Sequence, residues 1–187
     1  PILRTSGLVV VNDNFRLEGL NLVIAPDPTR LQMGKAIGPD NEEHDFIIYS
    51  SEQPYFQSNS LAVIDPITIA PTYTQGTTAN TYKIENVLLI NNGQITTPTG
   101  SLLMKSGSLT WNVTPVKNLK GGYDIYAQRK DYNLYTGGTW YEGFGKVLED
   151  NYLTSSGKDE KGKIYDKIDQ ITNEESFRKN VSSLAGD

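Results

Sequence analysis

The first 135 residues alternate short apolar runs with polar breaks, a pattern typical of β-strands joined by turns. Runs such as Leu8–Val11 and Leu31–Ala36 are separated by segments rich in Asn, Gly and Pro. The predicted strands cover residues 8–11, 15–24, 31–36, 46–50, 61–64, 67–70, 81–91, 101–105, 108–113 and 123–128. Because no helical spacing interrupts them, the pattern predicts a mainly β fold, an antiparallel sandwich or barrel.

Three glycines mark the places where we expect the chain to change direction. The pair Asn92 and Gly93 predicts a tight hairpin, because both central residues of such a turn need a positive φ. The pair Ser106 and Gly107 predicts a second hairpin. At Gly19 the apolar residues change from one parity of the alternation to the other, which indicates a bulge or bend.

Two further segments qualify this pattern. An apolar strand followed by an Asn-rich turn occurs twice, at residues 8–14 and 87–93, and we interpret the similarity as common strand–turn composition rather than a duplication. Residues 72–81 are polar and Thr-rich and have no apolar periodicity. They predict an exposed loop or arm.

From about residue 160 the apolar spacing becomes helical. Two sets of three apolar residues follow the spacing i, i+4, i+7: Ile164, Ile168 and Ile171, then Phe177, Val181 and Leu184. Thr172 and Glu175 have the spacing of a capping box, so we predict helices at 160–171 and 173–184 after a polar linker. Helices with so few apolar residues must dock, either on the sheet of this chain or on a neighbouring subunit. The predicted organisation is a β-rich domain at 1–150 and a helical appendage at 151–187.

The segment "LYTGGTWYEGFG", residues 134–145, places four aromatic rings among four glycines. Its rings belong to Tyr135, Trp140, Tyr141 and Phe144. Three interpretations stay open: a ligand platform whose rings stack on sugars, an anchor at a protein interface, and a wide turn whose rings fold back on the core.

Charge and cysteine content narrow the class of protein. The formal net charge is −5 and the sequence pI is about 4.9, which argues against a nucleic-acid-binding face. The chain has no Cys, so disulfides and thiol catalysis are excluded. Its start, Pro1–Arg4, does not resemble a signal peptide, and no apolar run is long enough to span a membrane. We expect a virion or cytoplasmic protein.

The sequence contains few groups suited to catalysis. Its single His, His44, lies in an acidic loop that lacks the fixed spacing of an EF-hand calcium site. Glu142 is the acid that has aromatic neighbours, as sugar-cleaving carboxylates often have, but no partner carboxylate can be assigned from sequence. We therefore predict no catalytic residue, no metal site and no cofactor.

These observations favour a non-enzymatic structural protein that works through protein–protein contacts. Abundant Asn, Thr, Ser and Gly in polar loops predict a phage or virion component, such as a capsid decoration, tail, baseplate or fibre protein. We expect a homo-oligomer or a larger protein assembly, without nucleic acid or membrane. The alternative is a carbohydrate- or small-ligand-binding β-domain that uses Tyr135, Trp140 and Tyr141.

Overall fold

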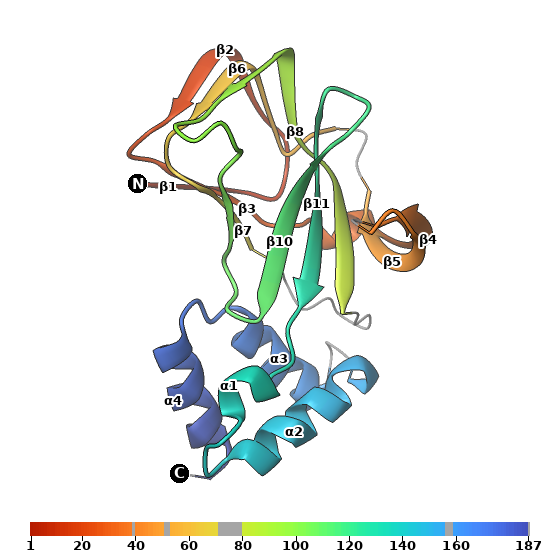
Figure 1. The fold of residues 1–187 in the computed structure, drawn as a ribbon, viewed down its shortest axis with the longest axis vertical. Coiled ribbons are helices and arrows are strands. Elements are labelled where there is room, and N and C mark those ends of the chain that lie inside the picture. The colour runs from red at the N-terminus through yellow and green to blue at the C-terminus, as the bar shows by residue number, and fades with distance from the viewer. Residues whose placement is uncertain (39, 51–52, 71–79, 156–158, 187) are drawn as a thin grey trace. The chain divides into compact units, whose positions relative to one another are not determined.

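The computed structural model describes the chain apart from residues 39, 51–52, 71–79, 156–158 and 187 (Figure 1). The chain divides into two compact units. The first comprises residues 1–70, 81–105 and 113–127, and the second comprises residues 71–80, 106–112 and 128–187. The boundary predicted at residue 150 therefore differs from the observed one, because the chain enters the second unit for the last time at Gln128. Most of the loop predicted at 72–81 lies outside the described residues.

The described residues form eleven strands in two sheets (Figure 1). They are β1 (Ile2–Thr5), β2 (Val9–Leu17), β3 (Asn21–Ile24), β4 (Leu31–Ile37), β5 (Glu43–Tyr49), β6 (Phe56–Val63), β7 (Ile67–Ile69), β8 (Thr81–Thr96), β9 (Met104–Ser106), β10 (Trp111–Lys117) and β11 (Gly122–Arg129). The prediction of a mainly β fold with a helical C-terminal segment is confirmed. Where a register is described, the pairing departs from the predicted antiparallel one: only β4 with β5 runs antiparallel, and the other five pairs are parallel.

The parallel pairs build a stack of three rungs within the first unit. Each rung consists of a long strand, a corner and a short strand: β2 with β3, β6 with β7, and β8 with β9. The long strands lie in the order β2-β6-β8 in one sheet, and the short strands in the order β3-β7-β9 in the other. Equivalent positions therefore form columns across the rungs, such as Val9, Phe56 and Leu88.

The columns explain why the alternation along these strands changes parity. On β6 the buried residues are Phe56 and Ser58, then Leu61 and Val63, because the register shifts between Ser58 and Ser60. The neighbouring strands accommodate the shift with extra residues, at 12–13 on β2 and 91–93 on β8. The predicted hairpin at Asn92 and Gly93 is therefore wrong. Gly93 has the expected positive φ of 65°, but it lies in an irregularity inside β8.

The two Asn-rich segments at 8–14 and 87–93 thus have a structural counterpart. Both lie beside the same irregular point of β6, one on each side. The predicted bend at Gly19 is also present. Gly19 has φ +69° in the corner between β2 and β3, and its N–H donates to Asp65 Oδ2 at 2.6 Å in the corner of the next rung.

The second unit contains the four α-helices of the described residues (Figure 1). They are α1 (Asn133–Thr136), α2 (Glu142–Asn151), α3 (Glu160–Asp169) and α4 (Glu174–Leu184). The helices α3 and α4 correspond to the predicted pair. The helices α1 and α2 include most of the aromatic segment 134–145, for which a wide turn was one of three interpretations. No described helix combines the length and apolar character needed to cross a membrane; the longest, α4, has 11 residues.

Glycine in the segment 134–145 permits two helices to pack closely. A Cβ on Gly145 would lie 2.6 Å from the Cβ of Thr136 and 2.8 Å from its Cγ2, so α2 can approach α1 only without a side chain here. Gly138 has φ +78° in the connection between these helices. The glycines therefore allow the close contact between α1 and α2 and the turn that connects them. Helix propensities predict these helices poorly, because glycine has a low helix propensity.

The predicted capping residue of the last helix is displaced by one position. Asn173 is the N-cap of α4, with an extended backbone and a side chain that accepts a hydrogen bond from the Ser176 N–H at 2.8 Å. Thr172 precedes the cap. In α3 the side chain of Asp159 plays the corresponding part by accepting from the Gly162 N–H at 2.6 Å.

Candidate functional site

The structure does not place the four rings of residues 134–145 on one exposed surface. Tyr135 and Tyr141 are buried, Phe144 is half-buried, and Trp140 is 65% exposed. Tyr135 packs against Phe177 with ring centroids 5.4 Å apart, while Trp140 meets the ring of Tyr141 edge-on at 5.3 Å. Of the four, only Trp140 offers an exposed ring face to a ligand or a partner.

Most of the apolar residues predicted for helix docking point into the second unit. Ile168, Phe177 and Val181 are buried, Ile164 and Ile171 are half-buried, and Leu184 is exposed. Phe177 lies 6.0 Å from the ring of Tyr132, between centroids. The helices therefore dock, through Phe177, on the aromatic residues that precede α2 in the same chain.

A buried carboxyl group lies at the centre of this aromatic cluster. Asp169 is 1% exposed; Tyr152 donates to its Oδ2 at 3.0 Å, and Tyr132 and Thr110 donate to its Oδ1, each at 3.5 Å. Burial raises the pKa of Asp169 to about 7, although hydrogen bonding to Tyr152 and Trp111 opposes the rise. Because the carboxyl is fully enclosed, it reaches no substrate, and its role is structural.

An ion pair borders the cluster. Arg129 and Glu149 form a two-pronged contact, in which Nη1 donates to Oε1 at 2.8 Å and Nη2 donates to Oε2. The guanidinium also lies 4.0 Å above the ring of Tyr152. Burial raises the pKa of Glu149, but hydrogen bonds from Arg129 and from the Tyr132 N–H outweigh it and lower the pKa overall. The sequence does not reveal this network, because its two halves, Arg129 with Tyr132 and Glu149 with Tyr152, lie 20 residues apart and meet only in the fold.

An apolar groove lies between α2 and α3. It encloses about 230 Å³ and is lined by Phe144, Val147, Leu148, Asn151, Lys161, Ile164 and Tyr165. Tyr165 donates to the Leu148 carbonyl at 2.6 Å and joins the helices at its base. Val147 is 55% exposed at its rim. The groove thus brings together Phe144, predicted as an interface residue, and Ile164, predicted as a docking residue. The sequence does not predict Val147 as an interface residue, because Gly143 and Gly145 make the helical spacing of the apolar residues in α2 hard to recognise.

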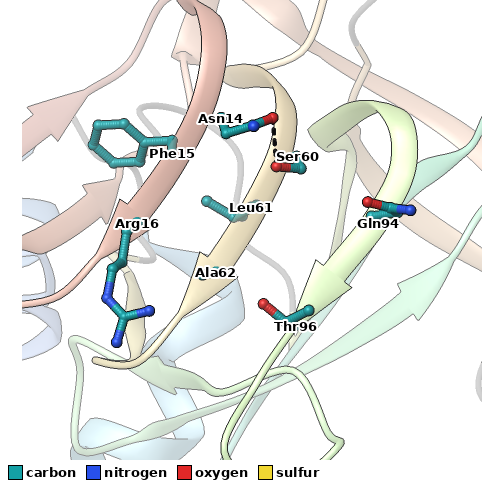
Figure 2. Close-up of a pocket in the computed structure, with 8 residues that line it drawn as sticks. All are labelled: Asn14, Phe15, Arg16, Ser60, Leu61, Ala62, Gln94 and Thr96. Atoms are coloured by element: carbon teal, nitrogen blue, oxygen red, sulfur yellow. Dashed lines mark hydrogen bonds between the residues drawn. The ribbon is translucent and has the colours of Figure 1, made fainter.

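An open trough with both polar and apolar lining residues, Phe15 and Leu61 among the latter, runs along the outer face of the rung stack (Figure 2). It encloses about 230 Å³ and crosses β2, β6 and β8. Its walls carry Asn14, Arg16, Gln94 and Thr96, which are exposed, and its floor follows Ser60 and Ala62 on β6. The Ser60 hydroxyl donates to Asn14 Oδ1 at 2.7 Å. No sequence motif indicates this site, because the three strands come together only through parallel pairing.

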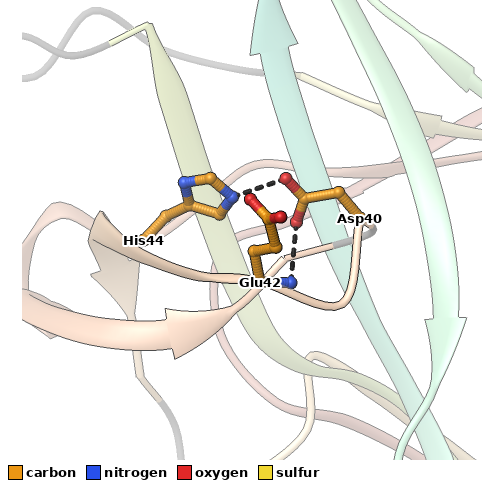
Figure 3. A group of neighbouring side chains, drawn as sticks. All are labelled: Asp40, Glu42 and His44. Carbon is orange, nitrogen blue, oxygen red and sulfur yellow. Dashed lines mark hydrogen bonds and ion pairs between the residues drawn. The ribbon is translucent and has the colours of Figure 1, made fainter.

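The acidic loop forms a compact group at the turn between β4 and β5 (Figure 3). His44 Nε2 lies 2.6 Å from Asp40 Oδ2, and the Glu42 N–H donates to Asp40 Oδ1 at 3.0 Å. One ligand atom from each of these residues lies within 4.8 Å of the others, and all three are exposed. These bonds satisfy the carboxylate of Asp40 within the turn, and we assign the group a structural part in closing the hairpin.

Glu142, the acid with aromatic neighbours in the sequence, lies on α2. Its Oε1 lies 3.9 Å from the Nζ of Lys146 on the same helix.

The fold and the sites define a mainly β protein with a helical C-terminal unit and two open grooves. The family model of the BigA beta sandwich domain matches residues 43–131, which is less than half of the chain and ends just before α1. The match covers β5 to β11 and leaves both β1 to β4 and the grooved helical segment outside. Searches among curated proteins and among solved structures found no match.

Proposed function

We propose that this chain is a non-enzymatic structural protein that self-associates through its helical unit. The groove between α2 and α3 is the observation behind the proposal, because it leaves Val147 exposed beside the half-buried Phe144 and Ile164. Apolar residues gathered at a helix–helix groove are typical of a surface that another helix covers.

A second copy of the chain is the occupant that the charges favour. Apart from Glu149, which is paired with Arg129, α2 has two acidic residues and one lysine. Apart from the buried Asp169, α3 has two acidic residues and three lysines. A two-fold axis that runs along the groove, parallel to the helices, places α2 of one copy against α3 of the other. The arrangement then pairs a net negative helix with a net positive one and covers Val147 in both copies.

The setting of this assembly is a separate proposal. The BigA match supports a bacterial surface protein, since that sandwich is of the bacterial Ig-like, surface or adhesin type. The polar loop composition favours a phage or virion component instead. Localising the chain by immunogold labelling of intact cells and of purified virions distinguishes the two settings.

Light scattering and sedimentation of the purified chain test the self-association. We expect a dimer that Val147→Asp converts to a monomer, because the new carboxylate would be buried without a partner. Leu119→Asp, in the connection between β10 and β11, is the matched control and should leave the dimer intact. A wild-type chain that stays monomeric at every concentration, or a dimer indifferent to Val147→Asp, contradicts the proposal.

A further inference from the structure

The trough on β2, β6 and β8 has a shape that follows directly from the columns of the rung stack. Two columns face outward there: Asn14, Ser60 and Gln94, then Arg16, Ala62 and Thr96. In each column the short side chain belongs to the central strand β6, and the longer ones belong to its neighbours. Since adjacent strands lie about 4.8 Å apart, the walls stand roughly 9.6 Å from each other.

The walls offer a particular chemistry. Asn14, Gln94 and Thr96 carry amide or hydroxyl groups that both donate and accept hydrogen bonds. The floor presents the methyl group of Ala62 and the hydroxyl of Ser60. A pyranose ring has the complementary distribution, with hydroxyl groups around its edge and C–H groups on its faces. Figure 2 shows the polar groups of Arg16 and Thr96 on either side of Ala62.

Arg16 brings a guanidinium group to the trough, and one edge of this group is paired with Glu18. Its Nε donates to Glu18 Oε2 at 2.6 Å, and the other guanidinium nitrogens take part in no described contact. A guanidinium has five N–H donors, so it can hold a second carboxylate through its Nη groups. No other ionisable side chain lines the trough among the described residues.

We propose that this trough binds a saccharide that carries a carboxylate, such as a uronic acid residue. Arg16 binds the carboxylate, and Asn14, Gln94 and Thr96 bind ring hydroxyls, while the ring rests on Ala62. The size of the trough fits a single sugar ring rather than a long chain. The site belongs to the first unit and does not depend on self-association through the helices.

A matched pair of sugars tests the proposal: methyl β-glucuronide and methyl β-glucoside differ only in the carboxylate. Titration of the full chain, followed by nuclear magnetic resonance of the Asn14 and Gln94 side-chain amides, should show tighter binding of the glucuronide. We expect Arg16→Gln to weaken glucuronide binding about tenfold or more and to leave glucoside binding unchanged. Lys117→Gln, an exposed substitution on β10, is the charge-matched control and should have no effect.

Ala62→Gln fills the floor and should abolish binding of both sugars, with the fold checked by circular dichroism. If Ala62→Gln fails to fold, Arg16→Gln still tests the proposal. The side chain of Arg16 is 61% exposed, so its replacement should leave the fold intact. The proposal is overturned if neither sugar shifts the two amides, or if Arg16→Gln leaves the affinity for the glucuronide unchanged. It is also overturned if a glutamate-rich peptide binds in the trough and the glucuronide does not.

Discussion

At the scale of single residues, the enclosed carboxyl of Asp169 has the clearest physical consequence. A group whose folded pKa, about 7, exceeds its ordinary value stays protonated in the folded chain while the unfolded chain ionises. The unfolded state therefore binds fewer protons between about pH 4 and pH 7. Stability conferred by the neutral carboxyl is fully present at the acid end of this window and falls as the pH rises through it.

We predict that Asp169→Asn removes this pH dependence. The free energy of unfolding of the wild type should decrease by up to about 1.4 kcal/mol per pH unit within the window. The amide cannot ionise, and it keeps the shape that Tyr132 and Tyr152 contact, so the profile of the variant should be flatter. Urea titrations at several pH values measure both profiles. Parallel profiles would show that the carboxyl ionises freely in the folded chain.

Gly145 allows a second prediction at this scale. Gly145→Ala should destabilise the chain by about 1–3 kcal/mol, because the new methyl group would overlap Thr136. Gly143→Ala on the same helix is the control, since a Cβ there has no neighbour within 4 Å. It should be neutral or stabilising, by up to about 1 kcal/mol. Thermal unfolding distinguishes the variants, and equal effects would disprove the packing role of Gly145.

Among the helices and strands, α4 has an N-cap residue that differs from the one its capping-box motif predicts. The capping-box spacing points to Thr172, but Asn173 has the extended backbone and makes the hydrogen bond. Asn173→Ala should therefore cost about 1 kcal/mol, whereas Thr172→Ala should have little effect. Chemical denaturation of both variants checks this. A larger loss for Thr172→Ala would restore the cap that the motif predicts.

At the scale of the whole molecule, the helices α3 and α4 are part of a folded unit rather than a free appendage. A chain that ends at Tyr152 loses Phe177, whose burial alone is worth about 3–5 kcal/mol, along with the rest of both helices. We expect the remaining helical residues to unfold and to bind an apolar dye. A chain that ends at Ala185 loses the exposed Gly186 and Asp187, which lies outside the described residues, and should match the full-length chain. If the chain that ends at Tyr152 binds no more dye than the full-length chain, the helices α3 and α4 are dispensable for folding.

Features that depend on contacts between near neighbours in the chain could be predicted from the sequence, whereas features that depend on distant contacts could not. The mainly β region and the two C-terminal helices followed from periodicity, which reflects contacts between near neighbours in the chain. The local backbone was also partly predictable, since Gly19 and Gly93 do have a positive φ. What Gly93 does with that conformation was not predictable, because an irregularity in a strand and a hairpin turn share the same local chemistry.

Local sequence therefore specified the mainly β character, the two C-terminal helices and the absence of cysteine chemistry. The parallel stacking of the long strands, which brings Arg16, Ala62 and Thr96 into one column, depends on the tertiary structure. The tertiary structure also decided that Tyr135 faces a core while Trp140 faces solvent, although both belong to the same aromatic segment. The physical reason is the same in each case: the partner of a strand or a ring is distant in the sequence, and packing rather than local propensity selects it.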